Sequence, residues 1–204
     1  MQQQNFSPED SIALIRSMID KTRKDFSDNS IYFLVWGWGA FLGCISQFIL
    51  KTMAHYQYHY RVWFITILCA VITVFISIRH KKEKRVETYI GESMGFLWAG
   101  LGITFFIISI IFMKMGWQYC FPFFMLLYGL GTFVSGKVIK YPPLVYGGLT
   151  SFFLAAVSPW VQYDYQILLA AVALLASYII PGHMLRLRYQ RSKESMYSNQ
   201  NTVL

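Results

Sequence analysis

The sequence has little charge, and six long apolar stretches have none at all. Only 14% of its 204 residues are Asp, Glu, Lys or Arg, whereas about a quarter are charged in a soluble domain. The uncharged stretches are residues 31–50, 62–78, 94–113, 117–136, 142–160 and 165–185. Each approaches the roughly 20 residues that a helix needs to cross hydrocarbon. Barrel strands would instead alternate over about ten residues, so the pattern predicts an all-α, polytopic membrane bundle of six transmembrane helices.

Catalytic and metal-binding patterns are also lacking. Proton- or ion-driven transporters usually need an ionisable group at mid-membrane, and the six stretches contain no acidic or basic side chain other than His183. No positioned acid–base pair or metal-ligand set is evident. The three cysteines, Cys44, Cys69 and Cys120, all fall in apolar stretches and are interpreted as small buried hydrophobes. We therefore expect no enzyme, no cofactor, no metal site and no catalytic residue. The chain start lacks a basic segment followed by an apolar core, so we expect no cleavable signal peptide.

Basic residues set the expected orientation. The run Arg79-His80-Lys81-Lys82-Glu83-Lys84-Arg85 lies between the second and third stretches, and such runs stay on the cytoplasmic side during insertion. Both chain ends then lie in the cytoplasm. Of the 18 Lys and Arg residues, only Lys51, Arg61 and Lys114 are then expected on the outer side of the membrane. The net charge of +8 is thus explained by topology, and we expect membrane lipids rather than nucleic acid as partners. A further hypothesis is that anionic lipid headgroups bind Arg79, Lys81, Lys82, Lys84 and Arg85.

The region 1–30 is predicted to be a cytoplasmic amphipathic helix with a linker. Ser7-Pro8-Glu9-Asp10 is a typical helix start, and one apolar stripe follows at helical spacing. The stripe offers Ile12, Ile15, Met18, Ile19 and Phe26 as partner-binding residues. The opposite face mixes acids and bases, whereas helices that lie on anionic lipid are rich in Lys and Arg. The stripe is therefore expected to engage protein: the bundle's own inner loops, a second copy or a separate partner.

Glycines and histidines supply the remaining candidates. Gly39 and Gly43 have GxxxG spacing, which allows close helix packing within the bundle or across a homodimer seam. His55 and His59 lie four residues apart in an aromatic loop, and Asp164 is the only acid expected on the same outer side. An interfacial loop and a metal or pH-sensing pair both remain open. Pro181-Gly182 predicts a bend or stop at His183.

Some segments repeat a pattern. The first, third and fifth stretches each carry an aromatic residue next to glycines, and the second, fourth and sixth each end at a basic residue. Three repeated hairpins would produce this pattern, as transporters often show. The ordinary likeness of apolar helices flanked by bases would produce it as well.

Four segments carry a resemblance: IRSMIDKTRKDF (15–26), YFLVWGWG (32–39), LYGLGTF (127–133) and YIIPGH (178–183). Together they resemble a family of small, uncharacterised six-span bacterial inner-membrane proteins, over residues 7 to about 188. The resemblance implies a bacterial inner-membrane location and a single architectural unit. It implies no activity and no site residue. From the residues themselves we expect one transmembrane domain over 31–187, followed by a polar, disordered cytoplasmic tail over 188–204. We expect a non-enzymatic interaction or regulatory protein that uses the amphipathic helix. The alternative is a passive or facilitated transporter or channel for a small neutral solute, lined by hydroxyls and amides.

Overall fold

The computed structural model describes residue 12 and residues 30–83, 89–188, 190 and 191. The described residues contain helices and no strand. The order is α2 (Ser30–Thr52), η1 (His59–Phe64), α3 (Ile65–Glu83), α4 (Tyr89–Met115), η2 (Trp117–Tyr119), α5 (Cys120–Val138), α6 (Pro142–Val157), η3 (Ser158–Trp160), α7 (Tyr163–Leu174) and η4 (Leu175–Ile179). The all-helical class is thus confirmed. The predicted amphipathic helix lies outside the described residues, apart from Ile12. Of the predicted C-terminal tail only residues 188, 190 and 191 are described, and these three are helical.

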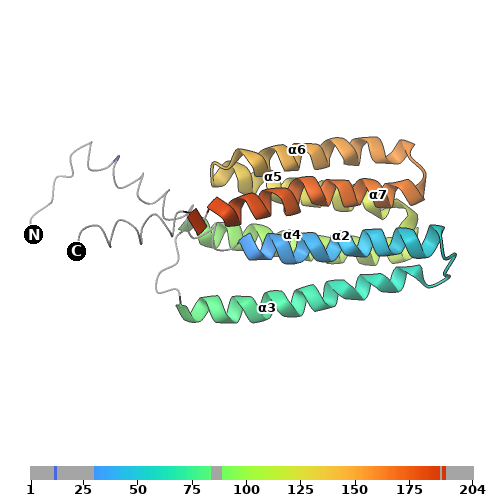
Figure 1. The fold of residues 1–204 in the computed structure, drawn as a ribbon, viewed down its shortest axis with the longest axis horizontal. Helices are drawn as coiled ribbons and strands as arrows, with labels where there is room; N and C mark the ends of the chain where they lie inside the picture. The colour runs from blue at the N-terminus through green and yellow to red at the C-terminus, as the bar shows by residue number, and fades with distance from the viewer. Residues whose placement is uncertain (1–11, 13–29, 84–88, 189, 192–204) are drawn as a thin grey trace, which may run out of the picture.

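The α-helices lie side by side along one axis and alternate in direction (Figure 1). Consequently α2 begins, α3 ends, α4 begins and the helix of α7 ends at the same end of the bundle. We call this the inner end, and the end that holds η1, η2 and η3 the outer end. The labels follow the expected topology. The charged run begins as helix, because α3 continues to Glu83; Lys84 and Arg85 lie outside the described residues.

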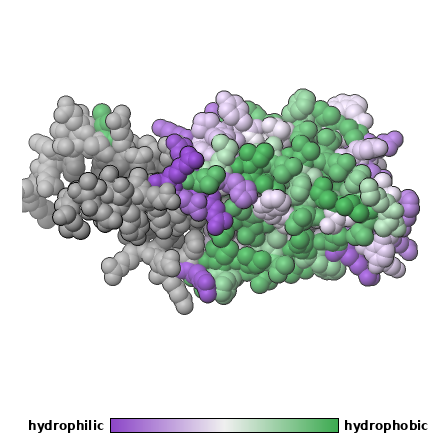
Figure 2. All heavy atoms as spheres, viewed as in Figure 1, coloured by the Kyte–Doolittle hydropathy of each residue, from purple (hydrophilic) through white to green (hydrophobic). Residues whose placement is uncertain are grey.

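Apolar side chains cover the sides of the bundle, and hydrophilic residues gather at its two ends (Figure 2). Within the described part of the chain, five helices are long and apolar enough to cross a membrane: Ile31–Thr52, His59–Arg79, Gly91–Met115, Trp117–Val138 and Tyr163–Arg188. A membrane protein is the natural interpretation of such a surface. The fifth predicted stretch, 142–160, forms α6, which has only 16 residues before η3 continues it.

Glycines bring α5, α6 and η4 close together. A Cβ at Gly136 would lie 2.7 Å from the backbone nitrogen of Val145, and one at Gly147 would meet the carbonyl oxygen of Ala176 at 2.5 Å. Small residues allow this approach in membranes, where lipid removes the hydrophobic drive between helices. The hairpin turn between α5 and α6 is tight: Lys140 has a φ of 52°, and Pro142 and Pro143 begin α6, where proline needs no N–H partner.

Two helices lie at the periphery. In α4 a single stripe at helical spacing faces the bundle; it consists of Met94, Leu97, Trp98, Leu101, Phe105, Ile108 and Phe112. In α3 the side that contacts α2 is still narrower, and most of the other apolar side chains are exposed. The face of α3 that points away from the bundle has a shallow furrow, lined by Ile67, Ala70, Val71, Val74, Phe75 and Ile78. All six belong to one helix, so the furrow is a surface feature of α3.

The predicted stop at Pro181-Gly182 is wrong. Helix continues from α7 through η4 and Pro181 to residue 188. The chain accommodates the proline with a π-helical turn: η4 immediately precedes it, and the N–H of Ile180 donates to the carbonyl of Leu175. A wider turn moves the carbonyl that a proline ring would otherwise strike. His183 therefore lies on a continuing helix and accepts a hydrogen bond of 3.2 Å from Nε1 of Trp38.

Candidate functional site

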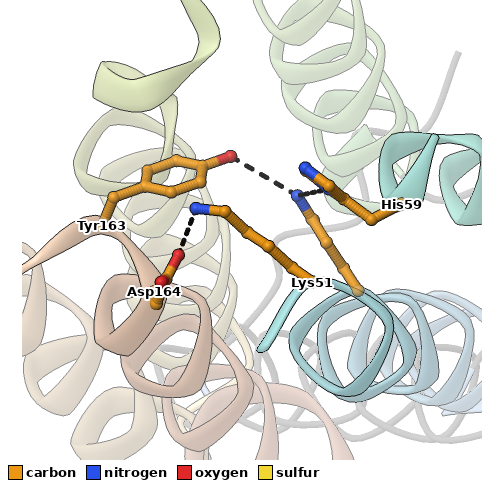
Figure 3. A network of polar contacts seen from close by, with 5 residues as sticks. Lys51, His59, Tyr163 and Asp164 are labelled. Atoms are coloured by element: carbon orange, nitrogen blue, oxygen red, sulfur yellow. Dashed lines mark hydrogen bonds and ion pairs between the residues drawn. The ribbon is translucent and has the colours of Figure 1, made fainter. Parts of the chain in front are cut away.

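A cluster of polar side chains joins three elements at the outer end. The last turns of α2 supply Gln47 and Lys51, which lie on one face because they are four residues apart. The turn η1 supplies His59 and Trp63, and the first turn of α7 supplies Tyr163 and Asp164. Figure 3 shows Lys51, His59, Tyr163 and Asp164 converging from these elements. We call the six residues the outer cluster.

Gln47 is the centre of the outer cluster. Its side chain is 2% exposed, and its amide contacts three partners. Its Oε1 accepts a hydrogen bond of 2.7 Å from Nε1 of Trp63. Its Nε2 lies 3.4 Å from Nδ1 of His59 and donates to the hydroxyl of Tyr163, also at 3.4 Å. A buried amide without partners would be costly, so these contacts make it compatible with the interior.

Lys51 and Asp164 of the outer cluster form an ion pair. The Lys51 ammonium also lies 4.1 Å from the centroid of the Tyr163 ring, a cation–π distance. A base in the last turn of α2 and an acid in the first turn of α7 both complement their helix dipoles. The pair is partly exposed, with 30% and 41% of the two side chains accessible. It therefore ties the end of one helix to the start of another at the solvent boundary.

Aromatic rings close the space beneath the outer cluster. The ring of Phe121 lies 5.6 Å from that of Tyr163 and 6.4 Å from that of Trp63, measured between centroids. Phe121 is itself buried. The arrangement leaves the polar groups bonded to one another over an apolar floor. The outer cluster is suited to holding α2, η1 and α7 together. A change in the charge of one of its side chains would alter these contacts.

Sequence reasoning placed His59 and Asp164 at this end but did not bring them together with Gln47. His59 belongs to the outer cluster, whereas His55 is exposed, with a φ of 47° in the turn before η1. The two histidines do not share a helix. Among the described residues, no group of three or more His, Cys, Asp or Glu side chains could hold a metal ion. Sequence reasoning did not use the four-residue spacing of Gln47 and Lys51. That spacing puts both side chains on one face of a helix, at the same end as the acid Asp164.

The two glycines predicted to mediate packing both face α3 or η1 of the same chain. A Cβ at Gly39 would collide with Sγ of Cys69, and one at Gly43 would be in ordinary contact with Ile65 and Trp63. Hydrogen bonds lie beside them. Nε1 of Trp36 donates to the hydroxyl of Thr73 at 3.0 Å, and the hydroxyls of Tyr32 and Ser77 are 3.2 Å apart. The α2–α3 contact is thus a ladder of small and polar residues.

Hydroxyls inside the spans mostly bond to backbone carbonyls. The described cases are Thr66 to Trp63, Thr104 to Gly100, Ser109 to Phe105, Thr132 to Tyr128 and Gly129, Thr150 to Tyr146, and Ser177 to Ala173. Ser151 also points to the carbonyl of Ala173, at 3.5 Å. A hydroxyl held this way is occupied by its own or a neighbouring helix. These residues therefore give little support to a continuous path for a polar solute.

The other predicted sites are at the inner end. Of the residues suggested for lipid headgroups, Arg79 is exposed and lies with its guanidinium 4.6 Å from the Phe75 ring centroid. Lys81 and Lys82 continue the α3 backbone. Of the partner-binding stripe, Ile12 is 57% exposed, and Ile15, Met18, Ile19 and Phe26 lie outside the described residues.

Comparison of the chain with protein-family models, with curated proteins and with solved structures finds no match.

Proposed function

We propose that this chain is a non-enzymatic interaction or regulatory protein of a bacterial inner membrane, with six membrane-spanning helices. The observation that carries the proposal is how the bundle uses its polar groups. Among the described residues, acidic and basic side chains lie near the two ends, and the hydroxyls between them mostly bond to backbone or to one another. Such an interior favours a scaffold for interactions at its ends over a reaction or a transport cycle inside it.

Charge asymmetry supports the proposed orientation. The described inner end carries Arg79, Lys137, Lys140, Arg186, Arg188 and Arg191, against Lys51, Arg61 and Lys114 at the outer end. Lys51 is paired with Asp164, which weakens the outer charge further. The positive-inside rule then puts the inner end in the cytoplasm. In this proposal α6, extended by η3, is also a span, the fifth along the chain, because it lies along α5 between the same two ends (Figure 1).

The proposed interaction uses the stripe of Ile12, Ile15, Met18, Ile19 and Phe26, which leads into α2 at the inner end. An amphipathic helix recognises a partner by laying its apolar face into a groove. Aspartates at Ile15 and Ile19 would put charge into that contact. The full-length protein carrying Ile15→Asp and Ile19→Asp should lose the proteins that co-purify with wild type from the native membrane.

The chain offers a matched control for this experiment. Ala13 and Ser17 have the same four-residue spacing but fall on the opposite side of a helix at 100° per residue. Ala13→Asp with Ser17→Asp adds the same charge and should retain the partners. The proposal fails if wild type, the Ile15/Ile19 variant and the control return the same set of proteins.

A further inference from the structure

The hydrogen bonds of Gln47 determine the protonation of His59. An indole N–H can only donate, so the Gln47 atom that faces Nε1 of Trp63 at 2.7 Å must be the carbonyl oxygen. The amide nitrogen then faces Nδ1 of His59 and the hydroxyl of Tyr163. Since that nitrogen is itself a donor, Nδ1 of His59 has to accept. His59 is therefore neutral in this arrangement and carries its proton on Nε2.

Protonation of His59 would oppose this arrangement in two ways. It would place an N–H on Nδ1, directed at the N–H of Gln47, so the 3.4 Å contact would become donor against donor. It would also add a positive charge near Lys51. The charged and titratable groups around His59 come from three elements. Lys51 belongs to α2, and Tyr163 and Asp164 belong to α7. Arg61 of η1 stacks on Tyr58, with its guanidinium 4.3 Å from the ring centroid. Asp164 is already paired with Lys51.

We propose that the outer cluster is a pH-operated clamp, closed when His59 is neutral and released when it is protonated. The element that it holds is weakly anchored, since η1 contains no buried residue. Its contacts with Gln47 run through His59 and Trp63. Loss of one of the two loosens η1 and the turn before it. The compartment that bathes the outer end would thereby control the outer connection of α2 and α3. The change falls in the acid part of the pH range from about 8 to about 5 in which histidine changes charge, because the surroundings of His59 oppose its protonation.

Amide hydrogen exchange of the full-length protein in lipid nanodiscs tests the clamp. After correction for the intrinsic effect of pH, peptides covering residues 53–62 should exchange roughly five- to tenfold faster at pH 5 than at pH 8. That factor corresponds to the loss of one hydrogen bond. Peptides from α5 and α6 should not change. A wild-type profile that is the same at both pH values overturns the proposal without any variant.

Three substitutions identify the titrating group. His59→Asn keeps an acceptor at the Nδ1 position and cannot be protonated, so residues 53–62 should stay protected at pH 5. His59→Lys carries a permanent charge and should exchange fast at both pH values. His55→Asn is the matched control, because it removes the neighbouring exposed histidine, and should behave as wild type. A pH response retained in His59→Asn, or lost in His55→Asn, overturns the assignment. Because no partner takes part, failure of the clamp and failure of the proposed interaction are separate results.

Discussion

Gly148 of α6 lies so close to α5 that a Cβ there would stand 2.7 Å from the backbone nitrogen of Phe133. The same Cβ would lie 2.8 Å from the carbonyl oxygen of Gly129. Both neighbours are backbone atoms and cannot turn away as a side chain can. The two helices therefore approach backbone to backbone at this point, as small-residue interfaces in membranes do.

Gly148→Ala is expected to destabilise the bundle by about 1–3 kcal/mol, the usual cost of forcing an extra methyl group into a packed interface. The matched control is Gly102→Ala in α4, where an added Cβ meets nothing within 4 Å. Its stability should equal or slightly exceed that of wild type, since alanine favours helix over glycine. Reversible unfolding in mixed micelles measures both. Equal loss in the two variants would contradict the close α5–α6 contact.

The α2–α3 ladder predicts coupling between Trp36 and Thr73, whose side chains share a 3.0 Å hydrogen bond. Trp36→Phe and Thr73→Val each remove it while leaving an apolar side chain. A double-mutant cycle should give a coupling free energy of about 0.6 kcal/mol, with about 1.7 kcal/mol as the upper end for such bonds in membranes. Purely additive losses of unfolding free energy would show that the hydrogen bond contributes nothing.

The ion pair of the outer cluster predicts charge complementarity between Lys51 and Asp164. Lys51→Glu should lower stability, because it sets two acids against each other. Combining it with Asp164→Lys should restore most of the loss. The coupling is expected to be about 0.2–1 kcal/mol, as for other partly exposed pairs, and to shrink as salt is added. Lys114→Glu is the control at the same end and should be insensitive to Asp164→Lys.

The helical class follows from composition, whereas the details of each helix depend on its surroundings. Long apolar stretches without charge are expected to form helices when they lie in a membrane. Stretch 31–50 indeed falls within α2. The end of α3 was harder to foresee: good helix formers such as Lys81 and Lys82 extend it into the charged run. Pro181 normally signals a helix end, but η4 accommodates it. That adjustment depends on tertiary packing and leaves no local signal.

The outer cluster could be predicted only in part. Lys51 and Asp164 are visible in the sequence as outer charges of opposite sign. Gln47 and Tyr163 are 116 residues apart, however, and nothing local indicates that their side chains meet. The fold determines their contact, because antiparallel helices bring the end of α2 beside the start of α7. The tautomer of His59 depends in turn on Trp63, so its role becomes visible only once the hydrogen bonds are known.

Cysteine labelling can test both the orientation of the chain and whether α6 crosses the membrane. The protein's own cysteines serve as the unlabelled control. Cys44, Cys69 and Cys120 are free and buried, so a membrane-impermeant maleimide should leave wild type unlabelled in intact cells. Gln57→Cys and Gln162→Cys place an exposed thiol at the outer end, and Lys137→Cys places one at the inner end. The first two should label in intact cells and the third only after permeabilisation, because the positive-inside rule puts the basic end in the cytoplasm.

The two cysteine substitutions at the ends of α6 show whether this short helix crosses the membrane. Lys137 precedes it and Gln162 follows it, and the 16 residues of α6 alone would span about 24 Å at 1.5 Å per residue, short of the roughly 30 Å hydrocarbon core. The three residues of η3 add about 6 Å at 2.0 Å per residue, which brings the combined length to that thickness. Opposite labelling of Lys137→Cys and Gln162→Cys is therefore expected. Labelling of both from one side would leave five spans and place the two chain ends on opposite sides of the membrane.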